Sequence, residues 1–188
     1  YSHIESIRKP FLAKAFDNSN GTLYEGTVVD FYENWTGGFE HKFGPKKTGF
    51  AQLQALTTAI DIKDDAEAEE AIWKVLDQDA FYKFWAMEGL LSFWDGYSGN
   101  RNNFFVYLNP ETDKFHFMPW GTDCAFQKYS PLGVDRRSPR SVRTVGIICH
   151  RLYQLPSVRK KYAATMKSLL ATHWDEKKLL AETERLED

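Results

Sequence analysis

The sequence predicts an α+β fold that is mainly helical and contains one β-hairpin. From residue 50 onward, apolar residues recur at helical spacing over several long stretches. Between residues 103 and 118, apolar and polar residues alternate on both sides of a polar turn, which is typical of two antiparallel strands. A chain of 188 residues, of which 43% are hydrophobic and 15% aromatic, is long enough to form one domain with a substantial core.

The first fifty residues predict short elements separated by turns. Residues 1–8 are expected to form the end of a strand, and residues 9–17 a short helix with its apolar side chains on one side. A cluster of turn-forming residues at 17–21 ends that helix. Residues 22–32 alternate as one strand or two short ones, and residues 42–48 are expected to form a loop.

Three helices are predicted between residues 50 and 94. The first has an apolar face over residues 50–60. The second, at residues 64–76, has an acidic first turn, which suits the helix dipole. The third is expected to begin at an Asp79 cap and to run to about Trp94, with an aromatic stripe that packs in the core. Three more helices are predicted over residues 142–155, 158–170 and 175–186.

Polar residues form an ordered series where the third of these helices ends. Asp95 is expected to follow that helix directly, Asn100 lies in the next loop, Asn103 precedes the hairpin, and Asp123 follows it. This is how a protein-kinase-like active site is laid out along a chain: one Asp handles the acceptor hydroxyl, and an Asn and a second Asp bind metal. Carboxylate and amide oxygens suit Mg²⁺, which neutralises charge during phosphoryl transfer.

The spacing of Asp95 and Asn100 is not specific by itself. The alternative interpretation is a surface hairpin in which Asp95 is a helix-end residue and residues 109–113 are an ordinary polar turn. The hairpin and Asp123 favour the kinase-like interpretation, because order, spacing and local structure then agree.

The middle of the chain resembles the CotH kinase family, which comprises spore-coat protein H and its relatives. The resemblance covers most of the 188 residues, because both ends are similar as well. Members of the family are atypical protein kinases that transfer phosphate from ATP to Ser residues of partner proteins. The segments that carry the resemblance are Trp85-Ala-Met-Glu88, Trp94-Asp95-Gly-Tyr97, Asn100-Arg-Asn-Asn103-Phe-Phe-Val-Tyr107 and Pro119-Trp120-Gly-Thr-Asp123-Cys-Ala-Phe126.

The resemblance implies a protein-kinase-like C-terminal lobe whose β-hairpin carries the metal site. It implies ATP- and Mg²⁺-dependent transfer to Ser or Thr of a protein substrate. Asp95 is then the catalytic carboxylate and Asp123 the principal Mg²⁺ ligand, while Asn100 and Asn103 both stay open as the second metal contact. Glu5 lies where the strand of the family passes toward the nucleotide, which gives it a weak nucleotide-binding role.

The sequence departs from the family pattern in two ways. Gly121 stands where the family usually has an acidic residue, and the loss of that carboxylate could weaken metal binding. No glycine-rich phosphate loop or strand lysine precedes the site, and Lys9 and Lys14 lie too late to replace them. In the family those parts lie upstream of the equivalent of Tyr1. We therefore expect residues 1–188 to be a single CotH-kinase-like domain, truncated at the N-terminus and weakly active alone.

The charge of the chain is unevenly distributed. Residues 124–174 carry ten Lys or Arg and one acid, Asp135, so this segment has a net charge of +9 and the rest of the chain −11. Such a field favours acidic, Ser-rich or already phosphorylated protein substrates. The alternative is a basic helical surface paired with the acidic residues 61–70. The weak candidates for substrate binding are Arg136, Arg137 and Arg140.

Other classes of protein fit the sequence less well. No stretch approaches the roughly 18–20 apolar residues of a membrane span, and the net charge of −2 argues against nucleic-acid binding. Cys124 and Cys149 lack the spacing of a zinc site and are expected to be two buried thiols. Two alternatives to a kinase stay open. One is a non-catalytic coat or cell-surface protein of the same fold, and the other is a carbohydrate-associated module. Family resemblance implies a spore coat, secreted or cell-surface location.

Overall fold

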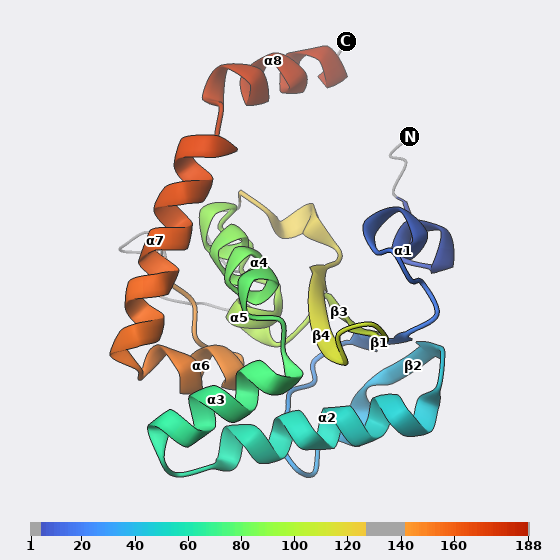
Figure 1. Ribbon diagram of the computed structural model, residues 1–188. Helices are drawn as coiled ribbons and strands as arrows, with labels where there is room; N and C mark the ends of the chain where they lie inside the picture. The colour runs from blue at the N-terminus through green and yellow to red at the C-terminus, as the bar shows by residue number, and fades with distance from the viewer. Residues whose placement is uncertain (1–4, 127–141, 188) are drawn as a thin grey trace.

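The computed structural model describes residues 5–126 and 142–187 of the chain (Figure 1). Within these ranges, eight α-helices accompany one four-stranded antiparallel sheet, so the predicted α+β class is confirmed. The predicted hairpin is not isolated, because two earlier strands extend it into the order β2-β1-β3-β4. The strands are β1 (Thr22–Gly26), β2 (Glu40–Phe43), β3 (Phe104–Asn109) and β4 (Lys114–Pro119).

The helices lie in three groups along the chain. In the part of the chain that the structure describes, one short helix precedes the sheet, four helices lie between β2 and β3, and three follow the hairpin. They are α1 (Lys9–Ala15), α2 (Lys46–Asp61), α3 (Asp65–Val75), α4 (Gln78–Leu90), α5 (Tyr97–Asn100), α6 (Ile147–Tyr153), α7 (Pro156–Thr172) and α8 (Glu176–Glu187), with short 3-10 turns at η1 (Thr36–Gly38) and η2 (Thr122–Cys124).

The two faces of the sheet pack against different partners. Alternate residues of a strand point to opposite faces, so Phe104 and Val106 of β3 face the large helical core, while Phe105 and Tyr107 face the other way. On that second face, Leu12 of α1 closes a smaller apolar cluster. The sheet therefore separates a fully packed layer from a face that α1 covers only in part (Figure 1).

The large core is built around the aromatic helix α4. Phe81 and Trp85 of α4 are fully buried, and α4 lies between α7 and β4 (Figure 1). Phe104 and Phe117 stack at 5.6 Å with an interplanar angle of 4°, and Tyr97 packs on both rings. Burying one such ring contributes about 1.5–3 kcal/mol, so this cluster holds the hairpin firmly against α4.

The loop predicted at residues 42–48 is wrong. Residues 40–43 form β2, and α2 begins at Lys46. The strand exists because it pairs with β1, where Tyr24 lies opposite His41, and because Lys42 forms ion pairs with acidic neighbours on the same face. Local propensity gives little sign of these tertiary contacts.

The prediction that Asp95 directly follows the aromatic helix is also wrong. The side chain of Asp77, not Asp79, caps α4 by accepting from the Ala80 N–H at 2.9 Å. The helix ends at Leu90, and residues 91–94 form a turn before Asp95. The apolar pattern continues through that turn, which is why periodicity alone overestimates the length of the helix.

Three other predicted elements were too long. The strand expected over residues 22–32 stops at 26, because Val28 has a φ of 47° and the chain turns away from the sheet. The helix expected over residues 142–155 starts only at Ile147. In the strand expected over residues 1–8, the described part is not a strand, and residues 1–4 lie outside the described ranges.

The predictions about the two cysteines and about membrane spans can be compared with the fold. Cys124 and Cys149 are both free thiols, as expected, but only Cys149 is buried. Among the described residues, no helix has the length and apolar character needed to cross a membrane.

Candidate active site

The Asp95 carboxylate lies at the centre of a cluster of asparagine amides. Asn100 donates to its Oδ1 at 2.7 Å, Asn102 donates to the same oxygen at 3.2 Å, and Asn103 donates to its Oδ2 at 2.8 Å. A carboxylate that accepts on both oxygens from fixed donors is held in one orientation. The arrangement leaves Asp95 partly exposed, so another molecule can reach it.

The backbone after Asp95 winds tightly to bring these amides together. A single helical turn, α5, places Asn100 over Gly96, whose carbonyl accepts the Asn100 N–H at 2.8 Å. Arg101 and Asn103 then adopt left-handed backbone angles, with φ of 55° and 50°. Such angles are uncommon outside glycine, although Asn tolerates them better than most residues. The result is that three asparagines within four positions can all turn toward one carboxylate.

Asp123 lies at the border of this cluster. It is exposed in η2, just beyond the end of β4. The Trp120 N–H donates to the Asn103 carbonyl at 2.9 Å, and a Cβ added to Gly121 would lie 3.2 Å from Asn103 Cγ. The segment that leads to Asp123 therefore packs directly on the asparagine cluster.

The Cys124 thiol lies within electrostatic range of both acids. Burial raises the pKa of this thiol, and the negative charges of Asp123 and Asp95 raise it further. The Cys124 sulfur lies 4.0 Å from Asp123 Oδ2. The charges of both carboxylates therefore act on the Cys124 side chain.

Asn102 was not among the predicted site residues. Its side-chain amide nitrogen donates to Asp95, and its side-chain amide oxygen, Oδ1, accepts the Val28 N–H at 3.1 Å. It therefore ties the segment after β1 to the candidate catalytic carboxylate. The only signal in the sequence is the run of three asparagines around Arg101, because the kinase spacing assigns no role to this position.

Two buried carboxylates beneath the loop were also missed. Glu88, which is 2% exposed, accepts the N–H groups of Tyr97 and Ser98, and burial raises its pKa to about 7 although the hydrogen bonds it accepts lower it. Asp30 is completely buried and accepts the hydroxyl proton of Tyr97. Glu88 had been assigned to the core stripe of its helix, and Asp30 lies in an apolar stretch without any motif.

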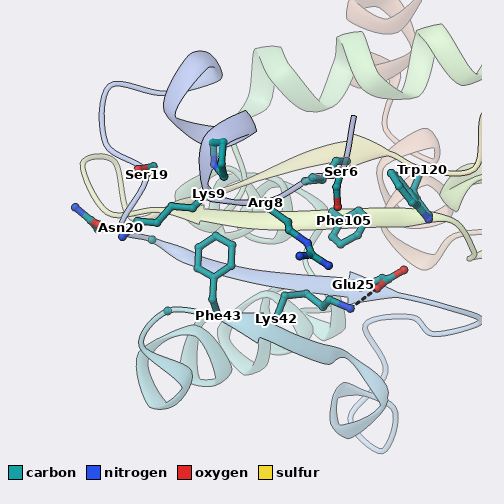
Figure 2. Close-up of a pocket in the computed structure, with 14 residues that line it drawn as sticks. Ser6, Arg8, Lys9, Ser19, Asn20, Glu25, Lys42, Phe43, Phe105 and Trp120 are labelled. Atoms are coloured by element: carbon teal, nitrogen blue, oxygen red, sulfur yellow. Dashed lines mark hydrogen bonds and ion pairs between the residues drawn. The ribbon is translucent and has the colours of Figure 1, made fainter. Parts of the chain in front are cut away.

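A groove of about 750 Å³ runs along the partly covered face of the sheet (Figure 2). Phe105 and Trp120 form part of its apolar lining, and their rings meet edge to face at 5.6 Å. Phe105 follows Asn103 closely in β3, and Trp120 comes shortly before Asp123. The groove therefore borders the two segments that lead to Asn103 and to Asp123.

The groove also contains a strand lysine that the sequence analysis did not find. Lys42 Nζ of β2 lies 2.9 Å from Glu25 Oε2 and 2.9 Å from Glu40 Oε1, and the hydrogen bonds that it donates to these acids raise its pKa. Figure 2 shows Arg8 extending toward the Glu25–Lys42 pair. Lys42 was overlooked because residues 42–48 were assigned to a loop.

The remaining predicted site residues lie elsewhere. Glu5 is exposed and forms an ion pair with Lys14 at 2.6 Å, and it is not among the residues that line the groove. The three arginines predicted to bind substrate, Arg136, Arg137 and Arg140, lie outside the described residues. The roles of these four residues stay predictions.

Comparison with known proteins bears on the kind of site this is. The sequence model of the family described as CotH kinase protein matches residues 1–188. The chain belongs to the CotH kinase family. It is 29% identical over 159 residues to Spore coat protein homolog 1 of Rhizopus delemar, an alignment that covers 78% of this chain and 26% of that protein.

A second relative of this CotH family member carries a different name. The chain is 26% identical over 118 residues to Invasin CotH2 of Rhizopus delemar, which covers 61% of this chain and 20% of that protein. The chain thus spans about a quarter of the first relative and a fifth of the second.

The residues of the site fit the Mg²⁺ and ATP that the CotH kinase family implies. Because Asp95 can only accept, the amide nitrogens of Asn100 and Asn103 must face it, and their amide oxygens must point away from it. These oxygens and the Asp123 carboxylate are the hard donors that Mg²⁺ uses together with phosphates and water. In the described part of the chain no three or more His, Cys, Asp or Glu residues gather as a metal cage. The groove has the volume of a small-molecule site.

Proposed function

We propose that this chain is the catalytic part of an ATP- and Mg²⁺-dependent atypical protein kinase that phosphorylates Ser or Thr of a protein substrate. The observation that carries the proposal is the Asp95 carboxylate, held by the amides of Asn100, Asn102 and Asn103. A groove of about 750 Å³ adds to it, because its lining includes Trp120, whose N–H donates to the Asn103 carbonyl. Membership of the CotH kinase family supports the same conclusion.

Asp95 has the properties needed to handle the acceptor hydroxyl. It is partly exposed and fixed in orientation, so it can align a Ser or Thr hydroxyl and accept its proton late in transfer. Asp123 and the amide oxygens of Asn100 and Asn103 would hold Mg²⁺. When bound, Mg²⁺ neutralises the charge of the transferred phosphoryl group.

The groove offers separate places for the two halves of a nucleotide. The rings of Phe105 and Trp120 lie at the end of the groove next to Asn103, where the phosphates must reach Mg²⁺, so the base would contact the apolar lining farther along, at Phe43 (Figure 2). Arg8 and Lys42 would contact the negatively charged phosphates. Without a nucleotide, the carboxylates of Glu25 and Glu40 supply the negative charge beside Lys42. The substrate is proposed to be an acidic or Ser-rich protein.

The proposal is tested by nucleotide binding and by phosphate transfer. Calorimetric titration should detect ATP binding that requires Mg²⁺, is lost in Asp123→Ala and is kept in Asp95→Ala. Radiolabelled phosphate should pass from ATP to an acidic Ser-rich peptide, and Asp95→Ala should abolish this. Because the chain spans about a quarter of the length of its first relative, transfer is measured on the longest natural form of the protein. ATP binding that ignores both Mg²⁺ and Asp123 would overturn the proposal.

A second candidate function is a non-catalytic coat or cell-surface protein of the same fold that acts through protein contacts. Two observations favour it: Gly121 replaces an acidic residue of the family pattern, and the two relatives are named as a spore coat protein homolog and an invasin. The titration separates the two candidates, because this function predicts no Mg²⁺-dependent nucleotide binding. The names of the two relatives support a coat or cell-surface location under either candidate function.

A further inference from the structure

Tyr97, two positions after Asp95, is held at both ends by buried carboxylates. Its backbone N–H donates to Glu88 Oε1 at 2.9 Å, and its hydroxyl donates to Asp30 Oδ1 at 3.0 Å. The second oxygen of Glu88 accepts the Ser98 N–H at 2.8 Å. Tyr97 itself is fully buried. One residue, through its backbone N–H and its hydroxyl, thus connects the loop of the candidate catalytic residue to two acids from other parts of the chain.

Asp30 extends this connection to a third segment. Its Oδ2 accepts the Ile147 N–H at 2.8 Å, at the first residue of α6. The Ile148 N–H donates to the Tyr97 hydroxyl at 3.1 Å. Asp30 also accepts the N–H of its neighbour Phe31 at 2.9 Å. The segment after β1, α5 and the start of α6 therefore meet at one carboxylate and one hydroxyl.

The surroundings of Tyr97 leave little space for it to move. A Cβ added to Gly96 would lie 2.2 Å from Glu88 Oε1, and one added to Gly146 would lie 2.7 Å from Tyr97 Cζ. Both glycines are therefore required for the close approach. The ring of Tyr97 contacts four other aromatic rings: Phe31, Phe81, Phe104 and Phe117.

The chain keeps these acids at a considerable energetic cost. Removing a carboxylate from water costs several kcal/mol, even after relaxation, unless hydrogen bonds compensate. Asp30 is 0% exposed and Glu88 is 2% exposed, and each is hydrogen-bonded through both of its oxygens. Hydrogen bonds to a charged acceptor are stiffer than neutral ones. Such groups suit a position where a loop must be fixed rather than merely covered.

We infer that Asp30 and Glu88 are positioning residues that fix Tyr97 and, through it, the Asp95 loop. The link is short, because α5 is one turn long and the Arg101 N–H donates to the Tyr97 carbonyl at 2.9 Å. A shift of Tyr97 displaces Asn100 and breaks its 2.7 Å hydrogen bond to Asp95. The catalytic consequence rests on the proposed function, whereas the mechanical link can be measured without activity.

The test compares two tyrosine hydroxyl deletions. Tyr97→Phe removes only the hydroxyl that bonds Asp30 and keeps the ring. Tyr24→Phe is the matched control, because Tyr24 is buried like Tyr97 and its hydroxyl is also a hydrogen-bond donor. The acceptor of the Tyr24 hydroxyl is not a carboxylate but the Lys46 backbone carbonyl, at 3.1 Å. Hydrogen–deuterium exchange of backbone amides 96–103 should become roughly tenfold to hundredfold faster in Tyr97→Phe, as expected for a lost hydrogen bond to a charged group. It should not change in Tyr24→Phe.

Kinetics supply the second measurement. In Tyr97→Phe and Asp30→Asn, kcat for phosphate transfer should fall at least about tenfold and by a larger factor than the Kd for ATP rises, because positioning acts mainly on the reacting groups. Equal exchange at residues 96–103 in the two tyrosine variants would overturn the inference. Absence of transfer by the unaltered protein would overturn the proposed function instead, and exchange would still decide whether the link exists.

Discussion

Asn103 donates its amide proton to Asp95 Oδ2 at 2.8 Å, while its backbone carbonyl accepts the Trp120 N–H at 2.9 Å. One residue therefore joins the loop before the hairpin to the chain that leaves it. Its left-handed backbone, with a φ of 50°, is what allows both contacts at once. Asn103 thus links Asp95 to the segment that leads to Asp123.

Gly121 provides the first prediction. Gly121→Asp restores the family acid, but it places a side chain where φ is 57° and where a Cβ meets Asn103 Cγ at 3.2 Å. We expect a loss of about 1 kcal/mol in the free energy of unfolding together with stronger Mg²⁺-dependent ATP binding. Denaturant unfolding and calorimetry measure the two effects.

Gly121→Asn is the matched control for this substitution, because it has the same shape without the charge. It should lose the same stability and gain no affinity. An equal gain in both variants would show that the carboxylate is not what the site lacks.

Asn102 gives the second prediction. Asn102→Asp keeps an oxygen for the Val28 N–H but replaces the donor to Asp95 with a second negative charge. We expect a loss of about 1–3 kcal/mol in the free energy of unfolding near pH 7, which disappears as the carboxylates are protonated. Asn109→Asp is the control, since the side chain of Asn109 also accepts a backbone N–H, that of Glu111 at 3.0 Å, in an exposed turn. Equal losses in the two variants would contradict the role of the amide.

Gly96 gives the third. A methyl group there would approach Glu88 Oε1 to 2.2 Å, so Gly96→Ala must displace a buried carboxylate. We expect a loss of about 1–3 kcal/mol in the free energy of unfolding, in the range of overpacked cores. Gly37→Ala, where nothing lies within 4 Å of the added Cβ, should stay within about 0.5 kcal/mol. Urea denaturation compares the two, and a neutral Gly96→Ala would mean that Glu88 is freer than its contacts indicate.

The raised pKa of Glu88, about 7, sets a pH dependence of stability. In the unfolded chain the pKa of a Glu is about 4.3, so between roughly pH 4.3 and 7 the unfolded state loses a proton that the folded state keeps. The free energy of unfolding should therefore fall as pH rises through this window, by up to about 1.4 kcal/mol per pH unit, and level off above it. Burial also raises the pKa of Asp30, which adds a trend of the same sign.

Three neighbours act on Glu88 electrostatically: Arg143, Cys149 and Tyr162. Arg143 stays charged at these pH values, and burial raises the pKa of Cys149 and of Tyr162, so neither of these groups titrates in the window. Glu88→Gln should remove the contribution of one titrating proton from the slope of the free energy of unfolding against pH, measured by urea unfolding between pH 5 and 8. Glu67→Gln, an exposed change in α3, should leave the slope intact. If the free energy of unfolding of Glu88→Gln depended on pH as steeply as that of the unaltered protein, other groups would be the cause of the pH dependence.

Lys42 gives the last prediction. Lys42→Met should weaken ATP binding roughly tenfold, because a phosphate contact in the groove is lost. It should change the free energy of unfolding by less than about 1 kcal/mol, since the ion pairs of Lys42 are solvent-accessible. Lys74→Met, which breaks the exposed pair with Glu70, should leave ATP affinity unchanged. Unaltered ATP binding in Lys42→Met would remove the lysine from the nucleotide site.

Elements with strong local patterns could be predicted from the sequence. The alternation of β3 and β4 around a polar turn, and the capped amphipathic helix α3, depend on residues close together in the chain. β2 could not be found in this way, because its stability depends on β1 and on ion pairs across the strands. The end of α4 was misplaced because apolar residues continue past it.

The site residues likewise divide into those that the sequence predicted and those that it could not predict. Asp95, Asn100 and Asn103 were predicted together, and the structure brings them into contact, because one short loop contains them all. Asp30 could not be predicted, since its partners Tyr97 and Ile147 lie 67 and 117 positions away. Only the folded chain reveals that an acid in an apolar segment is a hydrogen-bonding centre.

The strand order has a consequence for how the protein acquires its structure. The central strand β1 pairs with β3, and the Gly21 N–H donates to the Tyr107 hydroxyl 86 positions later. During synthesis, the edge of β1 that pairs with β3 therefore stays unpaired until the intervening helices and β3 have been synthesised. Closing so long a loop is slow compared with forming local turns. We expect the hairpin to dock late and to limit the folding rate, and until it docks neither the groove nor the asparagine cluster exists.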